Sequence, residues 1–89
     1  MIKKDIKISN RLGLHARPAA MIAQKAGEFS CEVKIAKDDV EVNAKSIMGV
    51  MMLAAEYGSS VRLTTDGEDE RQAAEAIAEL FNNKFNEDF

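Results

Sequence analysis

The sequence contains a single cysteine and a single histidine, and aromatic residues make up only 6% of it. Cys31 therefore has no partner for an internal disulfide, and one histidine with one cysteine gives too few ligands for a zinc site. Nucleic-acid binding normally needs a dense basic patch with aromatic platforms, which this composition does not favour. We expect no metal, no cofactor and no nucleic-acid partner, and Cys31 should pack in the interior or remain idle.

Long hydrophobic runs are also missing. No apolar stretch approaches the length of a membrane span, and the first residues lack the apolar core of a signal peptide. We therefore expect a cytoplasmic protein that does not insert into membranes. The 89 residues predict one domain, 1–89, with a modest core.

The formal net charge of −3 is unevenly distributed along the chain. Residues 1–45 have a balance of +3, whereas residues 46–89 have a balance of −6. A mildly basic half that contains the histidine favours an acidic partner or a phosphate group. The signal is weak, because such asymmetry commonly arises from solvated helix faces.

Hydrophobic periodicity predicts seven elements in the order βαββαβα. The predicted strands are 2–9, 31–36, 40–43 and 59–65, and the predicted helices are 16–26, 46–55 and one from Glu68 onward. In the third strand, Val40 and Val42 are expected to face inward. The last helix is defined by three acids in its first turn and by an apolar stripe: Ala73, Ala74, Ile77, Leu80, Phe81 and Phe85. Amphipathic helices and alternating strands together predict a two-layer α+β domain, with helices covering one sheet face.

The histidine lies in the segment GLHARP at residues 13–18, where the first helix is expected to begin. A neutral imidazole can act as a nucleophile near neutral pH. A helix start offers an anion site, because its first backbone N–H groups, here those of Ala16 and Arg17, have no intrahelical partner. The Arg17 guanidinium adds donors that match phosphate oxygens. The segment therefore indicates a phosphorylated His15, the alternative being a solvated histidine near a helix cap.

Two motifs together resemble a known family. The segment GLHARPAA at residues 13–20 looks like the active-site signature, and NAKSIMGVMML at 43–53 looks like the regulatory-serine signature, of the histidine-containing phosphocarrier (HPr) proteins. These proteins belong to the bacterial phosphoenolpyruvate-dependent sugar phosphotransferase system. The resemblance covers nearly the whole chain. It implies an open-faced two-layer β-sandwich, in which three helices cover one face of a four-stranded antiparallel sheet of order 1-4-2-3.

The resemblance also implies a mechanism. The phosphoryl group would reside on Nδ1 of His15, donated by phosphorylated enzyme I and passed to the A component of an enzyme II. Arg17 and the N–H groups of Ala16 and Arg17 would stabilise the phosphate. The chain would be a monomeric, stoichiometric carrier rather than an enzyme.

Ser46 is expected to serve as the N-cap of the second helix. By resemblance it is also the serine that a dedicated kinase/phosphorylase modifies in hosts that have this enzyme. That helix is too apolar for all its residues to face the sheet. Val50 and Leu53 are expected in the core, whereas the resemblance assigns Ile47, Met48 and Met51 to partner docking.

Two other functions stay open at the level of sequence. A paralogous regulatory protein would act mainly by binding partners, for example in nitrogen-related or carbon-catabolite control. A hydrolase with His15 as nucleophile would need a general base, and none accompanies the histidine in the sequence.

Overall fold

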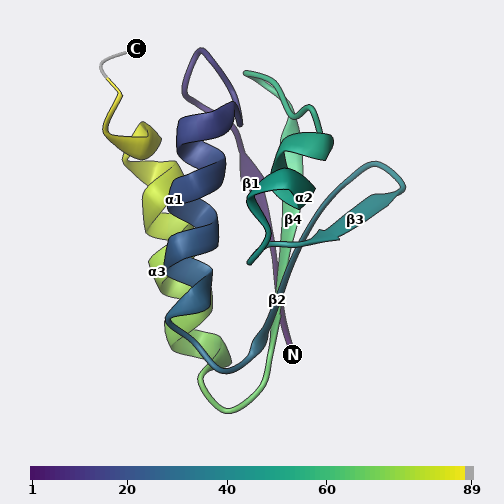
Figure 1. Ribbon diagram of the computed structural model, residues 1–89, viewed down its shortest axis with the longest axis vertical. Coiled ribbons are helices and arrows are strands. Elements are labelled where there is room, and N and C mark those ends of the chain that lie inside the picture. The colour runs from purple at the N-terminus through teal and green to yellow at the C-terminus, as the bar shows by residue number, and fades with distance from the viewer. Residues whose placement is uncertain (88–89) are drawn as a thin grey trace.

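A computed structural model describes residues 1–87 of the chain. The elements are β1 (Ile2–Lys7), α1 (Ala16–Gly27), β2 (Glu32–Lys37), β3 (Val40–Asn43), α2 (Ile47–Met52), β4 (Ser60–Asp66), α3 (Glu70–Asn82) and the 3-10 turn η1 (Lys84–Asn86). The strands form one antiparallel sheet in the order β1-β4-β2-β3. Figure 1 shows α1 and α3 side by side against this sheet. The predicted fold class and strand order are both confirmed.

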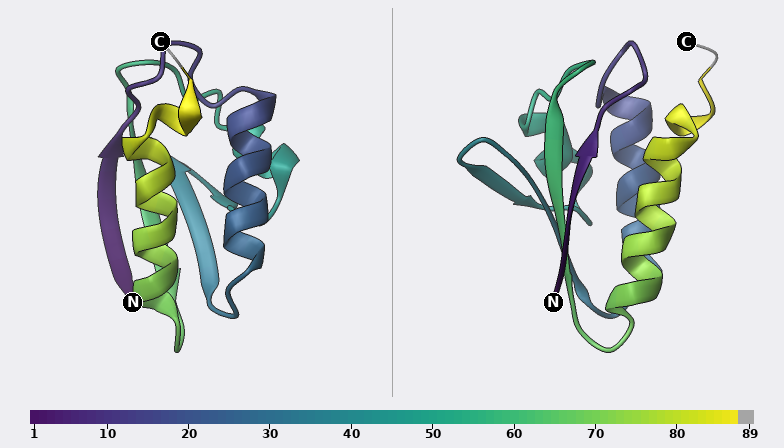
Figure 2. Two further views of the ribbon diagram at one scale, coloured as in Figure 1. Left: turned by 90° about the vertical axis from the view of Figure 1, so that its left-hand side faces the viewer. Right: turned by 180° about the vertical axis from the view of Figure 1, so that it is seen from behind.

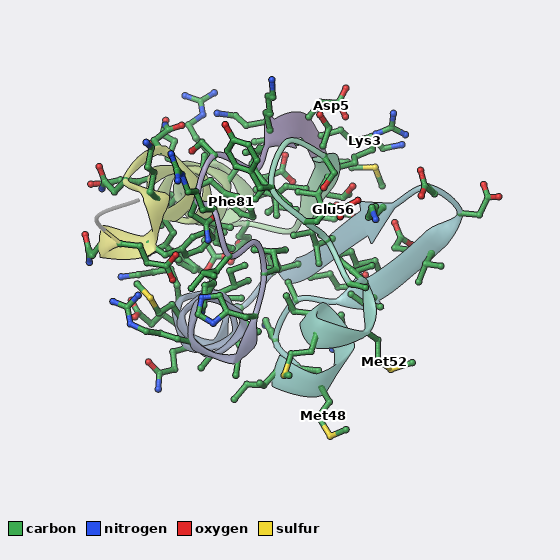
Figure 3. The ribbon with its side chains drawn as sticks, turned by 90° about the horizontal axis from the view of Figure 1, so that it is seen from above. Lys3, Asp5, Met48, Met52, Glu56 and Phe81 are labelled. Atoms are coloured by element: carbon green, nitrogen blue, oxygen red, sulfur yellow. The ribbon has the colours of Figure 1, made fainter. Side chains whose placement is uncertain are left out.

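The core lies between the sheet and the helices. Seen end-on in Figure 3, the helices lie on the inner side of a curved sheet, while Lys3 and Asp5 of β1 project from its outer side. Alternation in β4 buries Val61 and Leu63 and leaves Arg62 outside, where its Nε lies 3.3 Å from Oδ1 of Asp5. Among residues 1–87, no helix has the length and apolarity needed to cross a membrane.

Helix α1 presents the stripe that the periodicity predicts. Ala19, Ile22, Ala23 and Ala26 are all buried. The helix continues one residue beyond the predicted end, through Gly27. Because Pro18 lies in the first turn, its missing N–H costs no helical hydrogen bond. The helix start at Ala16, directly after His15, is therefore fixed by its own local sequence.

The predicted boundaries of the other two helices were partly wrong. Helix α2 ends at Met52 rather than residue 55, and Ala54 follows it with a left-handed φ of 49°. Helix α3 begins at Glu70 rather than Glu68. Asp69 is its N-cap residue, and the Asp69 carboxylate accepts hydrogen bonds from the backbone N–H groups of Ser30 and Cys31 instead of capping the helix. The Asp69 carbonyl accepts the helical hydrogen bond from Ala73 N–H, while its side chain joins α3 to the segment before β2.

Two predictions about apolar residues also need correction. Phe85 is buried but lies outside α3, because the helix ends at Asn82 and the chain turns at η1. Val40 is half exposed instead of facing inward, since it lies at the hairpin end of an edge strand, paired with Lys37. Val42 does pack against the core, as predicted. Cys31 is buried, and burial raises the pKa of its thiol, so it remains a packing residue.

Candidate functional site

The loop between β1 and α1 holds His15 in place through Gly13. This glycine has a φ of 68°, and a Cβ at this position would lie 2.5 Å from the carbonyl oxygen of Ala55. The close approach allows the N–H of Leu14 to donate to that same oxygen over 2.9 Å. Leu14 is buried, which anchors the loop one residue before the histidine. Glycine is required here for both backbone conformation and space.

His15 occupies the N-cap position of α1. Its carbonyl accepts the helical hydrogen bond from Ala19 N–H, while its side chain caps no backbone group within residues 1–87. The first turn carries no acidic residue. The N–H groups of Ala16 and Arg17 therefore remain available to an anion, and the helix dipole favours negative charge there.

The imidazole of His15 contacts a residue from the end of the chain. Its Nε2 lies 2.7 Å from Oε2 of Glu87, whose side chain is only 7% exposed. An ionised carboxylate can only accept hydrogen bonds, so Nε2 is the nitrogen that carries the proton. Nδ1 of a neutral ring then keeps its lone pair. The ring itself is 36% exposed and so remains within reach of a partner.

Glu87 is held from a second side by Asn10. The Nδ2 group of Asn10 donates to Oε1 of Glu87 over 3.1 Å and to the carbonyl of Gly13 over 2.8 Å. Burial alone would raise the pKa of the Glu87 carboxyl. The hydrogen bonds from His15 and Asn10, with the electrostatic interactions of the carboxylate with His15 and Arg17, outweigh burial and hold this pKa below its usual value.

Arg17 also turns toward the end of the chain. Its Nη1 donates to the backbone carbonyl of Phe85 over 2.8 Å and lies 3.5 Å from Oε2 of Glu87. Half of its side chain is exposed, so the guanidinium is tethered but accessible. Arg17 and His15 are therefore brought together at one helix start, as the motif predicted.

The turn η1 is what brings Glu87 to this site. Lys84, Phe85 and Asn86 all have positive φ, between 52° and 61°. The ring of Phe85 is buried and meets Phe81 of α3 edge-on, with centroids 4.9 Å apart. Burial of Phe85 compensates for a backbone that L-residues seldom adopt. Figure 1 and the two views of Figure 2 show this segment beside the start of α1.

Sequence reasoning missed Asn10, Glu87 and the carbonyl of Phe85. Glu87 lies 72 positions from His15, and no local pattern connects them. One sequence signal could have pointed to Glu87. Phe85, an aromatic residue of a type that is commonly buried, stands near the end of the chain, which suggests that this segment packs against the core and that the residues beside Phe85 are held in place with it.

The second motif forms a separate surface on α2. Ser46 is the N-cap, as predicted, and its Oγ accepts a hydrogen bond from the N–H of Gly49 over 3.0 Å. Val50 and Leu53 are buried, whereas Ile47, Met48 and Met51 are 42%, 73% and 43% exposed. These three residues, named here the α2 patch, form the exposed apolar surface that the sequence predicted. Helix α2 packs against α1, so the α2 patch belongs to the helix layer that carries His15.

Comparison with known proteins agrees with this geometry. A family model described as the PTS HPr component phosphorylation site matches residues 2–83. The phosphocarrier protein HPr of Cupriavidus necator is 52% identical over 87 residues, covering 98% of this chain and 98% of that protein. A crystal structure of HPr from Thermoanaerobacter tengcongensis covers 100% of both chains with a TM-score of 0.96 and 45% identity.

A relative with a different name also matches. The HPr-like protein Crh of Halalkalibacterium halodurans is 48% identical over 77 residues, covering 86% of this chain and 92% of that protein. The chain belongs to the HPr family, and its function is that of a phosphocarrier protein of the phosphotransferase system.

Proposed function

We propose that this phosphocarrier accepts its phosphoryl group on Nδ1 of His15 from phosphorylated enzyme I and passes it to the A component of an enzyme II. The observation that supports this most directly is the hydrogen bond from Nε2 of His15 to Glu87, because it leaves Nδ1 as the nucleophilic nitrogen. The N–H groups of Ala16 and Arg17, which have no partner among residues 1–87, and the Arg17 guanidinium are suitable for the incoming phosphate.

Phosphoryl transfer requires mostly positioning and charge stabilisation, and this small site offers both. We propose a stoichiometric carrier rather than a hydrolase. Glu87, the carboxylate that contacts His15 within residues 1–87, lies against Nε2 and not Nδ1, so it is poorly placed to activate water against a phosphoryl group on Nδ1. A phosphohistidine formed at this site should therefore persist until an acceptor protein arrives.

The α2 patch is proposed to dock these partners. Exposed methionines are flexible and adapt to surfaces of different shape. Met48 and Met52 provide a matched comparison, since they are 73% and 74% exposed on the same short helix and both project into solvent in Figure 3. Met48→Gln should weaken enzyme I binding several-fold by calorimetry, whereas Met52→Gln should change it little. Equal losses from both substitutions would contradict this docking surface.

Ser46 is proposed as the regulatory position, modified by a kinase/phosphorylase in a host that has one. As the N-cap of α2, Ser46 directly precedes Ile47 and Met48, so a phosphate there would act on the α2 patch.

Incubation with phosphoenolpyruvate and enzyme I tests the carrier function itself. The wild-type protein should gain one acid-labile, base-stable phosphate, and a partner A component should remove it. His15→Ala should gain none. A wild-type chain that binds enzyme I but acquires no phosphate would instead support the regulatory alternative.

A further inference from the structure

The relay as proposed so far uses Glu87 only to indicate which nitrogen of His15 is free, and it does not explain why the Glu87 carboxylate is buried beside the ring. Withdrawing a carboxylate from water is unfavourable unless hydrogen bonds and charge compensate for it. Here the side chain is 7% exposed, and it accepts hydrogen bonds from Nε2 of His15 over 2.7 Å and from Nδ2 of Asn10 over 3.1 Å. The chain also adopts three successive left-handed residues to bring Glu87 to this place. Such an arrangement is typical of a functional contact.

The contacts around position 87 require a side chain with two hydrogen-bond acceptors. One oxygen of Glu87 faces the Nε2–H of His15, and the other faces the Nδ2 group of Asn10. Asn10 is 1% exposed, and its amide orientation is fixed because Nδ2 also donates to the carbonyl of Gly13. A glutamine at position 87 would present its own NH₂ group to one of these two donors. Asn10 therefore orients Glu87, and Glu87 orients the histidine ring.

We infer that Glu87 is a positioning residue for phosphoryl transfer: it holds His15 in the Nε2–H tautomer, directs Nδ1 toward the donor, and balances the positive charge that the ring gains. The inference rests on the proposed transfer at Nδ1. A carboxylate behind a reacting histidine acts in this way in other proteins, where it fixes the tautomer and stabilises the cationic ring.

The step balances without any additional reactant. The Nδ1 lone pair forms the new N–P bond, while the bond between phosphorus and the donor breaks and its electron pair returns to the donor. The ring keeps its Nε2 proton and so becomes positively charged. The Glu87 carboxylate lies against that proton, and no proton has to move to Glu87. Transfer onward reverses these changes, with the electron pair of the N–P bond returning to Nδ1.

An inhibitory role is the main competing interpretation. Glu87 also lies 3.5 Å from Nη1 of Arg17, and a carboxylate there competes with phosphate for the guanidinium. Arg17, however, makes its shorter contact with the carbonyl of Phe85, at 2.8 Å. Glu87 contacts the nitrogen that does not react, and the ring is still 36% exposed. The contacts therefore favour positioning, and the two roles predict opposite effects on rate.

The test compares Glu87→Gln with Glu79→Gln, which makes the same change on the exposed side of α3. Steady-state phosphorylation by phosphoenolpyruvate and enzyme I should show kcat reduced about tenfold or more for Glu87→Gln, the scale of one charge-assisted hydrogen bond. KM for enzyme I should be unchanged, because the proposed docking surface, the α2 patch, does not include Glu87. Glu79→Gln should behave as wild type, and Glu87→Asp should recover part of the rate.

Nitrogen NMR of the unphosphorylated protein separates this inference from the proposed function. At a pH where the ring is neutral, wild type should show only the Nε2–H tautomer, and Glu87→Gln should show a mixture. An unchanged kcat, a raised kcat, or a fall that appears only in KM would overturn the positioning role. If wild type shows the single tautomer but is never phosphorylated on His15, the proposed function fails while the contact itself is verified, and positioning for transfer fails with it.

Discussion

Nε2 of His15 and Oε2 of Glu87 lie 2.7 Å apart although 72 positions separate them in the chain. The N-cap residue of α1 and the residue that follows η1 therefore meet at the proposed nucleophile. In the proposed relay, a short motif at the start of α1 supplies the reacting group, and the segment after α3 sets which nitrogen of that group is free. Variants can separate these contributions, because each rests on different contacts.

Replacing Arg17 with alanine should affect transfer far more than folding. The side chain is half exposed, so its tether to the Phe85 carbonyl contributes little to stability. We expect a melting temperature within a few degrees of wild type. Transfer should slow by about tenfold or more, which corresponds to the loss of one contact of about 1.5 to 3 kcal/mol. Arg71→Ala on α3 is the control, and an unchanged transfer rate for Arg17→Ala would exclude the role in phosphate stabilisation.

Gly13 and Gly27 flank α1 and should respond oppositely to alanine. At Gly13 a Cβ would lie 2.5 Å from the Ala55 carbonyl oxygen, and φ is 68°. Gly13→Ala should therefore lower stability by at least about 1 to 2 kcal/mol and also slow phosphorylation of His15. No atom lies within 4 Å of a Cβ built on Gly27, so Gly27→Ala should be neutral or stabilise by up to about 1 kcal/mol. Thermal melts of the two variants decide between these outcomes.

A negative charge at Ser46 should hinder docking without disrupting α2. The Ser46 Oγ accepts a hydrogen bond from Gly49 N–H, and an aspartate can make the same cap. Ser46→Asp should thus show unchanged or raised stability, but weaker affinity for enzyme I, because the charge raises the desolvation cost of the adjacent α2 patch. Ser46→Ala, which loses the cap without adding charge, should be less stable by about 1 kcal/mol. Equal affinity with a clearly lowered melting temperature for Ser46→Asp would contradict this mechanism.

The Glu87 contacts predict a stability difference that depends on pH. The pKa of Glu87 is lowered from its usual 4.5 in the folded protein, so the folded state binds fewer protons than the unfolded chain as acid is added. Wild type should be more stable than Glu87→Gln above about pH 4.5. The advantage should decline as the pH falls through the lowered pKa. Urea unfolding at pH 7, 4 and 3 measures it, and an advantage that grows in acid would show that the carboxylate is not the stabilised form.

Local sequence signals predicted those parts of the site that depend on neighbouring residues. The helix start at Ala16 and the Ser46 cap follow from periodicity and capping within a few residues. The excess of apolar residues on the second helix predicted an exposed patch, and the family resemblance assigned its members. Glu87 could not be predicted in this way, because it reaches His15 through η1. Its three left-handed residues include Lys84 and Phe85, which have no local preference for that conformation.

Tertiary contacts also overrode the local signals at helix α3 and at the sheet edge. Asp69 was expected to support its own helix, but its carboxylate binds two N–H groups of the segment before β2. Val40 follows the alternating apolar pattern of β3, yet it lies at the end of an edge strand, where its side chain stays half exposed. In both cases the outcome depends on contacts between elements that are distant in the chain, and the periodicity of a short segment does not describe such contacts.

The central claim is that Nδ1 of His15 carries the phosphoryl group while Nε2 keeps its proton beside Glu87. Protein labelled with ¹⁵N in the histidine ring, phosphorylated by phosphoenolpyruvate and enzyme I, tests this directly by nitrogen–phosphorus correlation NMR. We predict coupling between phosphorus and Nδ1, together with a protonated Nε2. Coupling between phosphorus and Nε2, or a phosphate that leaves both ring nitrogens unmodified, would contradict the account.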